Sequence, residues 1–452
     1  MQSINPANDE LLREYAETEP AAVERILADA ERAFESWRTT SFATRAERMK
    51  RAGSLLRERK DELARLMALE MGKPLAQGRA EADKCALVCD FYAEQAEQFL
   101  APRSIPTDAT KSLVVFQPLG VVLAVMPWNF PFWQVFRFAA PALMAGNAGL
   151  LKHASNVSGC ALAIEEIIHA AGFPKGLFRS LLIGSARVGA LIEALQVKAV
   201  TLTGSTPAGR SVAAKAGERL KKTVLELGGS DPYLILEDAD LELAAETCVA
   251  SRLINGGQSC IAAKRFIVVE PVADRFLERF KTELASRKMG DPTARETQVG
   301  PQARTDLRDQ LHHQVEESVK RGARALLGGQ VPAGKGAFYP PTLLSAVDRG
   351  MPAFDEETFG PVAAVIRAKD EADAIRLAND TAFGLGAALW TRDRARAERL
   401  AVQIEAGAVF VNGVVKSDPR LPFGGIKRSG YGRELSEYGI REFVNIKSVW
   451  IA

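Results

Sequence analysis

The chain has 452 residues, of which 47% are hydrophobic and 25% are charged. This length exceeds that of one ordinary domain, so two or three lobes are expected. The 58 basic and 56 acidic residues leave a net charge of +2. This balance, with no basic arm and no block of like charge, argues against a nucleic-acid partner.

Cysteine usage and apolar runs indicate the compartment. An odd number of cysteines without a CxxC pair argues against a disulfide scaffold and favours a reducing environment. The polar start, MQSINPANDELLREY, lacks the apolar core of a signal peptide. The longest apolar stretch, residues 119–132, is too short for a membrane span of about 20 residues. The sequence therefore predicts a cytoplasmic protein that does not contact a membrane. The five cysteines are Cys85, Cys89, Cys160, Cys248 and Cys260.

The first part of the chain has helical patterns. Apolar residues recur at three- and four-residue steps over residues 19–37, which predicts an amphipathic helix. Helical patterns continue to about residue 99. Residues 112–125 then resemble a β-hairpin, with Pro118 and Gly120 as turn residues.

From there, patterns of buried strands alternate with helices. Such alternation predicts parallel sheets in an α/β architecture. Helices are expected from about residues 206 and 240, and a surface loop at residues 331–340. The expected strands are residues 199–205, 223–229, 232–238, 264–270, 363–370, 386–393 and 407–413.

A dinucleotide site fits this architecture, although the usual GxGxxG fingerprint follows none of the expected strands. The closest match, residues 384–389, lacks the third glycine. At Thr203-Gly204-Ser205 a strand ends and a helix begins, so free backbone N–H groups there could face a phosphate. Ser205 could equally be a plain helix N-cap.

The chain has only four histidines, and they form no Ser-His-Asp pattern and no metal cluster with cysteine. A general base must then come from another side chain, which points to a carboxylate. Several motifs place candidate groups beside glycines or at strand ends. They are PWNFP (127–131), LELGG (225–229), NGGQSC (255–260), EETFGP (356–361) and PFGGIKRSG (422–430).

With these motifs in this order, the chain resembles the aldehyde dehydrogenase superfamily from residues 5–7 to its C-terminal strand. Cys260 lies 34 residues after Glu226, which matches the family's spacing of nucleophile and base. The resemblance implies that Cys260 is the nucleophile and Glu226 the base that activates water. It also implies an oxyanion hole formed by the Asn129 side chain and the backbone N–H of Cys260. A carboxylate in an apolar strand should have a raised pKa, which suits this role.

The resemblance also implies a nicotinamide cofactor and no metal. Ser155 stands where many NAD-specific relatives have a glutamate that binds the ribose hydroxyls. A serine beside Lys152 tolerates a 2′-phosphate, so NADP is favoured over NAD. Alternatively, Ser155 only begins or caps a helix. The implied cofactor residues are Trp128, Lys152, Ser155, Gly204 and Ser205 around the pyrophosphate and adenosine ribose, and Glu357 and Phe359 around the nicotinamide ribose and ring.

The substrate tunnel is implied to include Phe130, Arg137, Ser417 and Phe423. Relatives that act on fatty or aromatic aldehydes carry aromatic residues at the positions of Arg137 and Ser417. A cation and a hydroxyl there fit a distal carboxylate, and succinate semialdehyde is the simplest candidate. Residues 412–434 also resemble the shorter bacterial succinate-semialdehyde dehydrogenases.

Two observations leave alternatives open. Ile254 stands where longer succinate-semialdehyde dehydrogenases have a second arginine, so a dicarboxylate semialdehyde should bind less tightly. Arg137 could also belong to a salt bridge on a packed helix. A broad-specificity short-chain aldehyde dehydrogenase is therefore the alternative function. Glu226 argues against a coenzyme-A-acylating relative, and the full set of catalytic residues argues against an inactive scaffold.

The family fold implies three parts. A Rossmann-like cofactor-binding domain should comprise residues 1–99 and 119–227. An α/β catalytic domain should comprise residues 228–444. A small β oligomerisation arm, residues 100–118 with 445–452, should extend a neighbour's sheet, because exposed edge strands pair readily. A homodimer or homotetramer is expected.

Overall fold

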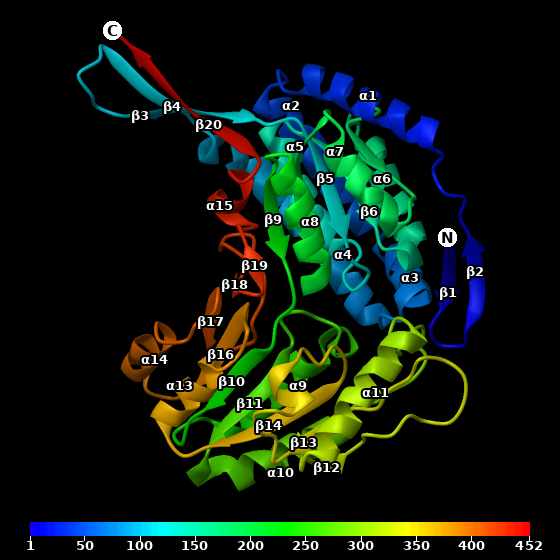
Figure 1. Cartoon of the computed structure of the whole chain (residues 1–452), viewed down its shortest axis with the longest axis vertical. Coiled ribbons are helices and arrows are strands. Elements are labelled where there is room, and N and C mark those ends of the chain that lie inside the picture. The colour runs from blue at the N-terminus through cyan, green and yellow to red at the C-terminus, as the bar shows by residue number, and fades with distance from the viewer.

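Two sheets of mainly parallel strands organise the chain, for which a computed structural model describes residues 1–452 (Figure 1). The strands of the first sheet are short apolar runs buried on both faces, as expected of parallel strands covered by helices. In spatial order this sheet consists of β19 (Gly430–Tyr431), β9 (Lys222–Glu226), β8 (Val197–Thr203), β5 (Val121–Met126), β6 (Ala148–His153) and β7 (Phe178–Ser180).

Helices cover this sheet. α1 begins at Pro20, where a missing backbone N–H costs nothing, and its buried stripe ends at Trp37. The central helix α5 (Trp133–Ala145) is buried along its whole length and ends at Gly146, which adopts a left-handed conformation. The other helices of this lobe are α1 (Pro20–Trp37), α2 (Phe42–Glu58), α3 (Lys60–Met71), α4 (Leu75–Phe99), α6 (Ser158–Ala170), α7 (Val188–Glu193) and α8 (Thr206–Glu218).

The second sheet has its own hydrophobic core. Its order is β12 (Arg324–Leu327), β13 (Thr342–Ser345), β14 (Val362–Ala368), β11 (Ala263–Val269), β10 (Asp231–Ile235), β16 (Gly386–Trp390) and β17 (Ala408–Val411). Only the β12–β13 pair is antiparallel. The helices of this lobe are α9 (Leu241–Leu253), α10 (Ala273–Ala285), α11 (Thr305–Lys320), α12 (Pro352–Asp355), α13 (Glu371–Asn379) and α14 (Arg394–Ala401). The α/β prediction is confirmed.

A third, three-stranded sheet projects from the body of the molecule (Figure 1). Its central strand β4 (Lys111–Pro118) pairs antiparallel with β20 (Val444–Ile451) and with β3 (Arg103–Ser104). Trp450 and Ile446 on β20 are 57% and 62% exposed. The short elements β1 (Gln2–Asn5), β2 (Glu10–Glu14), β15 (Phe383–Gly384), β18 (Ile426–Lys427) and α15 (Ser436–Ile440) complete the fold.

The β-hairpin predicted at residues 112–125 is wrong. β4 pairs with β20, whereas β5 lies between β6 and β8 in the first sheet. Gly120, with φ +137°, does turn the chain between them, but it directs the two strands into different sheets. The apolar run of β5 can be buried on both faces only inside a helix-covered sheet, and this burial outweighs the local turn signal.

The predicted domain bounds stay a prediction, and one detail differs from them. β19, within the expected catalytic domain, pairs with β9 of the first sheet. The chain therefore crosses back to the first lobe near residue 430. The predicted loop at residues 331–340 contains no helix or strand, although its end is buried at Ala337 and Tyr339.

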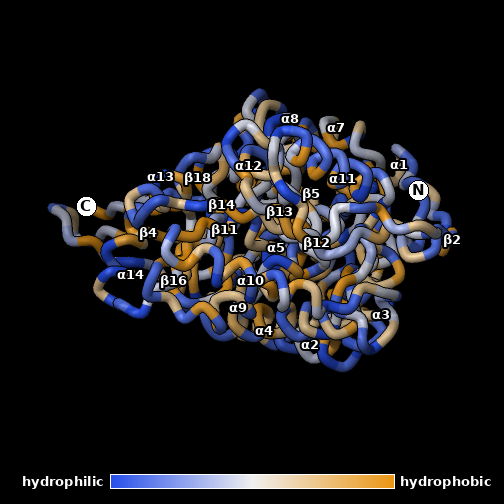
Figure 2. Tube along the Cα trace, turned by 90° about the horizontal axis from the view of Figure 1, so that it is seen from below, coloured by the Kyte–Doolittle hydropathy of each residue, from blue (hydrophilic) through white to orange (hydrophobic).

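Hydropathy along the fold follows burial. In Figure 2 apolar segments run through the interior, whereas hydrophilic segments such as those near α8 and α14 lie outside. No helix combines the length and the apolar character needed to span a membrane.

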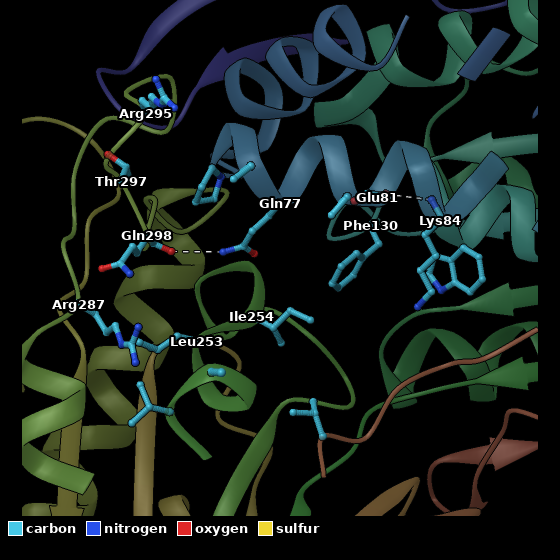
Figure 3. A pocket seen from close by; sticks show the side chains of 17 residues that line it. Gln77, Glu81, Lys84, Phe130, Leu253, Ile254, Arg287, Arg295, Thr297 and Gln298 are labelled. Atoms are coloured by element: carbon cyan, nitrogen blue, oxygen red, sulfur yellow. Dashed lines mark hydrogen bonds between the residues drawn. The ribbon is translucent and has the colours of Figure 1, made fainter. Parts of the chain in front are cut away.

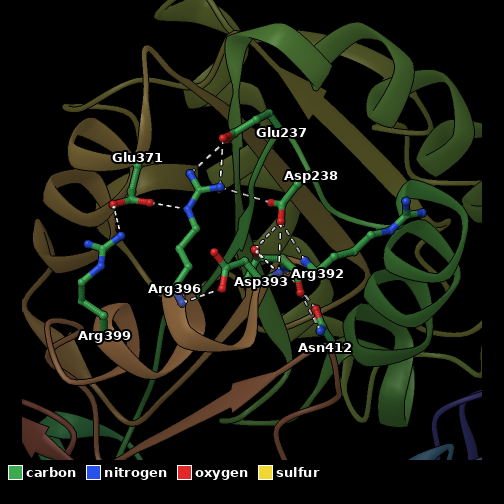
Figure 4. Close-up of polar contacts among 9 residues, drawn as sticks. Glu237, Asp238, Glu371, Arg392, Asp393, Arg396, Arg399 and Asn412 are labelled. Carbon is green, nitrogen blue, oxygen red and sulfur yellow. Dashed lines mark hydrogen bonds and ion pairs between the residues drawn. The ribbon is translucent and has the colours of Figure 1, made fainter.

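An ion-pair network stabilises the outer side of the second lobe (Figure 4). Arg396 on α14 donates to Glu237 at 2.9 Å and pairs with Glu371 at the start of α13. Asp238, next to Glu237, accepts hydrogen bonds from the Thr391 hydroxyl and from two following backbone N–H groups. Networks of this kind contribute more than isolated surface pairs. This one connects the segment after β10 to α13 and α14.

Candidate active site

A cavity of about 570 Å³ is lined by residues from both lobes. One wall comes from the segments that follow β5, β8 and β9, where the carboxyl ends of parallel strands meet. This edge is where ligands of open α/β sheets bind. The lining includes the expected residues Trp128, Asn129, Gly204, Ser205, Cys260, Glu357 and Phe359.

The turn between β8 and α8 forms part of this wall. The Gly204 N–H donates to the backbone oxygen of Glu226, and the Ser205 side chain accepts from the Ala208 N–H at 3.4 Å. Ser205 is thus a helix N-cap that also lines the cavity, and its contact with a phosphate stays a prediction. Across the cavity wall, the rings of Trp128 and Phe359 meet edge to face with their centroids 5.8 Å apart.

Lys152 and Ser155 lie at the carboxyl end of β6, next to β5. Burial lowers the pKa of Lys152. Ser155 is the first residue of a short 3-10 helix, η1 (Ser155–Val157). This agrees with the alternative that Ser155 begins a helix. Between them, His153 Nε2 donates to the Pro131 oxygen at 2.9 Å, Nδ1 accepts the Ala154 N–H, and burial lowers the pKa of His153 to about 4. A neutral histidine therefore connects the end of β6 to the PWNFP turn.

Cys260 follows a glycine turn whose backbone is left-handed at Asn255, Gly256 and Gly257. A Cβ on Gly257 would come within 2.2 Å of the Gly360 oxygen, so only glycine fits there. This turn brings the NGGQSC and EETFGP motifs into direct contact.

Asn129 is held by hydrogen bonds on both ends of its amide. Its Nδ2 donates to the Gln258 oxygen at 2.9 Å, and its Oδ1 accepts from Gln134 Nε2 at 2.9 Å. The Asn255 side chain donates to the backbone oxygens of Asn129 and Gln258. These bonds fix which end of the amide faces the Cys260 turn and leave the second N–H of Asn129 without a protein acceptor.

The thiol of Cys260 differs from the other four cysteines because it alone is not fully buried. Burial raises its pKa to about 12, although the positive charges of Arg137 and Lys264 oppose the rise. Lys264 donates to the Cys260 oxygen at 2.7 Å and to the Ser259 oxygen at 2.9 Å. Lys264 Nζ also lies 3.4 Å from Glu357, whose carboxylate accepts the Gly229 N–H. The thiol is therefore protonated at rest and needs a base.

Glu226 lies at the end of β9 and is 2% exposed. Neither carboxylate oxygen has a hydrogen-bond partner. Burial raises its pKa well above the ordinary value, the nearby Glu434 raises it further, and Arg137 lowers it. A desolvated, unpartnered carboxylate that acts electrostatically on Cys260 can accept a proton near neutral pH.

Arg137 forms a buried ion pair with Glu434, donates to Thr203 Oγ1 at 3.3 Å, and lies 4.7 Å from the Phe423 ring centroid. Arg137 and Phe423 line neither large cavity of this region. The structure therefore contains the salt bridge of Arg137 on a packed helix that the sequence analysis gave as an alternative.

A second cavity, of about 590 Å³, lies on the other side of the Asn129 turn. Phe130, Trp133 and Ile254 line it (Figure 3). Ser417 is buried beside it and accepts a hydrogen bond from Trp133 Nε1 at 3.1 Å. Of the residues predicted for the tunnel, Phe130 lines this cavity and Ser417 contacts its lining, and their role in binding substrate stays a prediction.

Sequence reasoning expected helical structure up to about residue 99 but missed the residues with which α4 borders this cavity. Glu81 Oε1 accepts the backbone N–H groups of Phe132 and Trp133 at 2.9 Å, and its second oxygen pairs with the fully buried Lys73. Lys84, one turn further, faces the same cavity. These residues lie in no recognised motif; only their three- and four-residue spacing along one helix face could have indicated them.

These features define an enzyme whose thiol lies beside a nucleotide-sized cleft and a separate second cavity. The chain belongs to the aldehyde dehydrogenase family, whose model matches residues 1–449.

Relatives and solved structures agree with this assignment. The chain is 53% identical over 450 residues to a probable NADP(+) succinate-semialdehyde dehydrogenase of Synechocystis sp., covering 100% of this chain and 99% of the relative. It is 49% identical to the NAD(P)+ succinate semialdehyde dehydrogenase Sad of Escherichia coli, with 99% and 97% covered. The crystal structure of a succinic semialdehyde dehydrogenase from Streptococcus pyogenes with NADP+ matches with a TM-score of 0.98 at 36% identity, covering 100% and 99% of the two chains.

Proposed function

We propose that this protein oxidises succinate semialdehyde to succinate and that NADP is its preferred electron acceptor, with NAD as a second. The observation that carries the proposal is the position of Cys260. Its half-buried thiol lines a cleft with dinucleotide-binding geometry, while an unpartnered carboxylate, Glu226, acts on it electrostatically. The names of the relatives support the choice of substrate and cofactor.

In the first half-reaction the thiolate of Cys260 attacks the aldehyde carbon. The thiol proton has to leave first, and Glu226 is the unpaired base available. The carbonyl oxygen becomes an alkoxide, which receives hydrogen bonds from the free N–H of Asn129 and the backbone N–H of Cys260. Gln134 and Asn255 keep the amide of Asn129 in the required orientation.

The lining of the cleft offers groups that can hold a nicotinamide dinucleotide. The turn at Gly204 and Ser205 presents the start of α8, and Lys152 lies at the end of a neighbouring strand. Trp128 and Phe359 line the part of the cleft that Cys260 also lines. When bound, the nicotinamide ring would accept the hydride that leaves the aldehyde carbon, and a thioester on Cys260 would remain.

Glu226 first releases the proton of the thiol to solvent. In the second half-reaction it takes a proton from water, which attacks the thioester and releases Cys260 as the thiolate. One aldehyde, one water and one oxidised cofactor give one carboxylate and one reduced cofactor, with release of protons. No metal is needed for these steps.

Cofactor and substrate choice rest on a few side chains. Ser155 brings no negative charge near Lys152, so a 2′-phosphate is tolerated there. Phe130 and Ser417 border the substrate cavity. Phe423 and Arg137 contact each other but do not line this cavity. Arg137 can attract a substrate carboxylate only while it also keeps its ion pair with Glu434.

The arm of β3, β4 and β20 is proposed to pair with a second copy of the chain, as a homodimer or a homotetramer. The apolar side chains of Ile446, Trp450 and Ile451 are exposed on it, and an edge strand offers free backbone groups.

The cofactor-binding domain (1–99 and 119–227), the catalytic domain (228–444) and a cytoplasmic location belong to the same proposal. The five unpaired thiols suit a reducing compartment.

Steady-state kinetics test the proposal. Formation of reduced cofactor is measured with succinate semialdehyde, butanal and benzaldehyde, each with NADP and NAD, for the wild type and Cys260→Ala. We expect Cys260→Ala to lose activity by roughly 10⁴-fold or more, because no other exposed thiol can replace it. Equal kcat/KM values for succinate semialdehyde and butanal would contradict the substrate, and a preference of about tenfold for NAD would contradict the cofactor.

A broad-specificity short-chain aldehyde dehydrogenase is the second candidate. It is favoured by the buried pairing of Arg137 with Glu434 and by apolar Ile254 on the cavity wall. Similar kcat/KM values for several short aldehydes in the same assay would support it.

A further inference from the structure

Lys84 is a half-buried cation in the middle of α4 that faces the second cavity (Figure 3). Its Nζ donates to Ser417 Oγ at 2.7 Å and lies 4.1 Å from the Trp133 ring centroid. Trp133 begins α5, four residues after Asn129. The ammonium group is thus held in one place by a hydroxyl and an aromatic face.

This cation has no anionic partner in the protein. The two carboxylates that act on it electrostatically are Glu81 and Asp418. Glu81 pairs with Lys73, and Asp418 pairs with Arg420. A half-buried ammonium group without a counter-ion is costly, so a bound carboxylate would stabilise it.

Ser417 complements the cation. Its oxygen already accepts hydrogen bonds from Lys84 Nζ and Trp133 Nε1. Because both neighbours are donors, the hydroxyl hydrogen of Ser417 is free to point elsewhere. Lys84 lines the cavity and offers a carboxylate a charged donor, and the buried Ser417, which Lys84 contacts, has a neutral donor left.

The one carboxylate of the lining near this pair, Glu81, is already neutralised by Lys73. The opposite wall carries Leu253 and Ile254, and Figure 3 shows Arg287 and Arg295 on the side away from Lys84. Arg287 pairs with Glu283 at 3.1 Å. Lys84 is thus the unpaired cation on the side of the cavity that carries Phe130 and Trp133, and Arg295 lies on the other side.

We propose that Lys84, with Ser417, binds the distal carboxylate of the semialdehyde and so sets the preference for a dicarboxylate product. This assignment rests on the proposed function and deepens it. It supplies a cation that Ile254 cannot provide and that Arg137, paired with Glu434, provides only in part.

The test compares Lys84→Met with Lys84→Arg. Methionine keeps the length and the apolar stem, whereas arginine keeps the charge. For Lys84→Met we expect kcat/KM for succinate semialdehyde to fall roughly 10- to 100-fold, mainly through KM, as for a lost charged hydrogen bond. The kcat/KM for butanal, which has the same chain length and no carboxylate, should stay within about twofold, and Lys84→Arg should recover most of the loss.

A pH series gives a second measurement on the wild type, which does not depend on the folding of a variant. Burial and the charge of Arg137 lower the pKa of Lys84 to about 8, while Cys85, Glu81 and Asp418 oppose this. The ammonium form exists below that pH. The ratio of kcat/KM for succinate semialdehyde to that for butanal should therefore be highest below pH 8 and fall above it. In Lys84→Arg the ratio should stay flat, because arginine remains charged.

The outcomes separate this assignment from the function on which it rests. If the wild type shows no preference for succinate semialdehyde, the proposed substrate is wrong and Lys84 has no carboxylate to bind. If the preference exists but persists in Lys84→Met, or if the butanal rate falls equally, the assignment to Lys84 is wrong. A ratio that does not change between pH 7 and pH 10 also overturns it.

Discussion

The two cavities on either side of the Asn129 turn are built from different kinds of sequence. The cofactor cleft is formed at strand ends by short motifs such as NGGQSC and EETFGP. The second cavity is formed largely by one face of α4 and by the side chains of Phe130, Trp133 and Ile254. Backbone geometry thus defines the chemistry, whereas exchangeable side chains define the selectivity. Substitutions on the two sides should therefore have separable effects.

After the loss expected for Cys260→Ala, the largest effect is expected at Glu226, which both half-reactions need. Glu226→Gln preserves shape but cannot accept a proton, so turnover should fall roughly 10²- to 10⁴-fold for charged and uncharged aldehydes alike. Rapid mixing should show whether a single equivalent of reduced cofactor still forms before turnover stops. Unchanged turnover in Glu226→Gln would assign the base to another residue.

The next effect concerns Arg137, which is buried and lines neither cavity. Arg137→Gln leaves the buried Glu434 without its cation, which should cost about 3–5 kcal/mol of stability in urea unfolding. The pKa of Glu226 should rise further, because Arg137 lowers it in the wild type. Rates near neutral pH should fall for butanal as well as for succinate semialdehyde. A loss confined to succinate semialdehyde would instead show that Arg137 binds the substrate carboxylate directly.

The smallest effect is expected on the cofactor side alone. Ser155→Glu places a negative charge near the proposed 2′-phosphate position, and kcat/KM for NADP should fall roughly 10- to 100-fold. The value for NAD should change little, and the ratio of succinate semialdehyde to butanal should stay constant. Ser155→Ala, which adds no charge, is the control. A changed aldehyde ratio would show that the two cavities are not independent.

Much of the fold could be predicted from the sequence because its determinants are local. The buried runs that form β8, β10 and β11 are continuous and apolar, and glycines or helix signals bound them. The hairpin at residues 112–125 failed because strand partners are chosen by burial across the whole sheet. The turn residues Pro118 and Gly120 carry no information about that choice.

The active site shows the same difference between local motifs and contacts formed by distant parts of the chain. Motifs place Asn129, Cys260 and Glu357 at one cleft, and the structure brings them together. The partners of Arg137 and Lys84 could not be predicted, because Glu434 and Ser417 lie about 300 residues further along the chain. Only the packing of α4 and α5 against the C-terminal segment reveals these contacts.

The carboxylate of Glu81 has a consequence for how this enzyme can diversify. It holds the start of α5, and with it the Asn129 turn, against α4. One helical turn further, Lys84 faces the second cavity and donates no hydrogen bond to a backbone group. Substitutions at position 84 can therefore change the aldehyde specificity of a homologue, while Glu81 keeps the Asn129 turn, and with it the reaction, in place. Directed evolution for new substrates should begin with that pair, one position varied and the other kept.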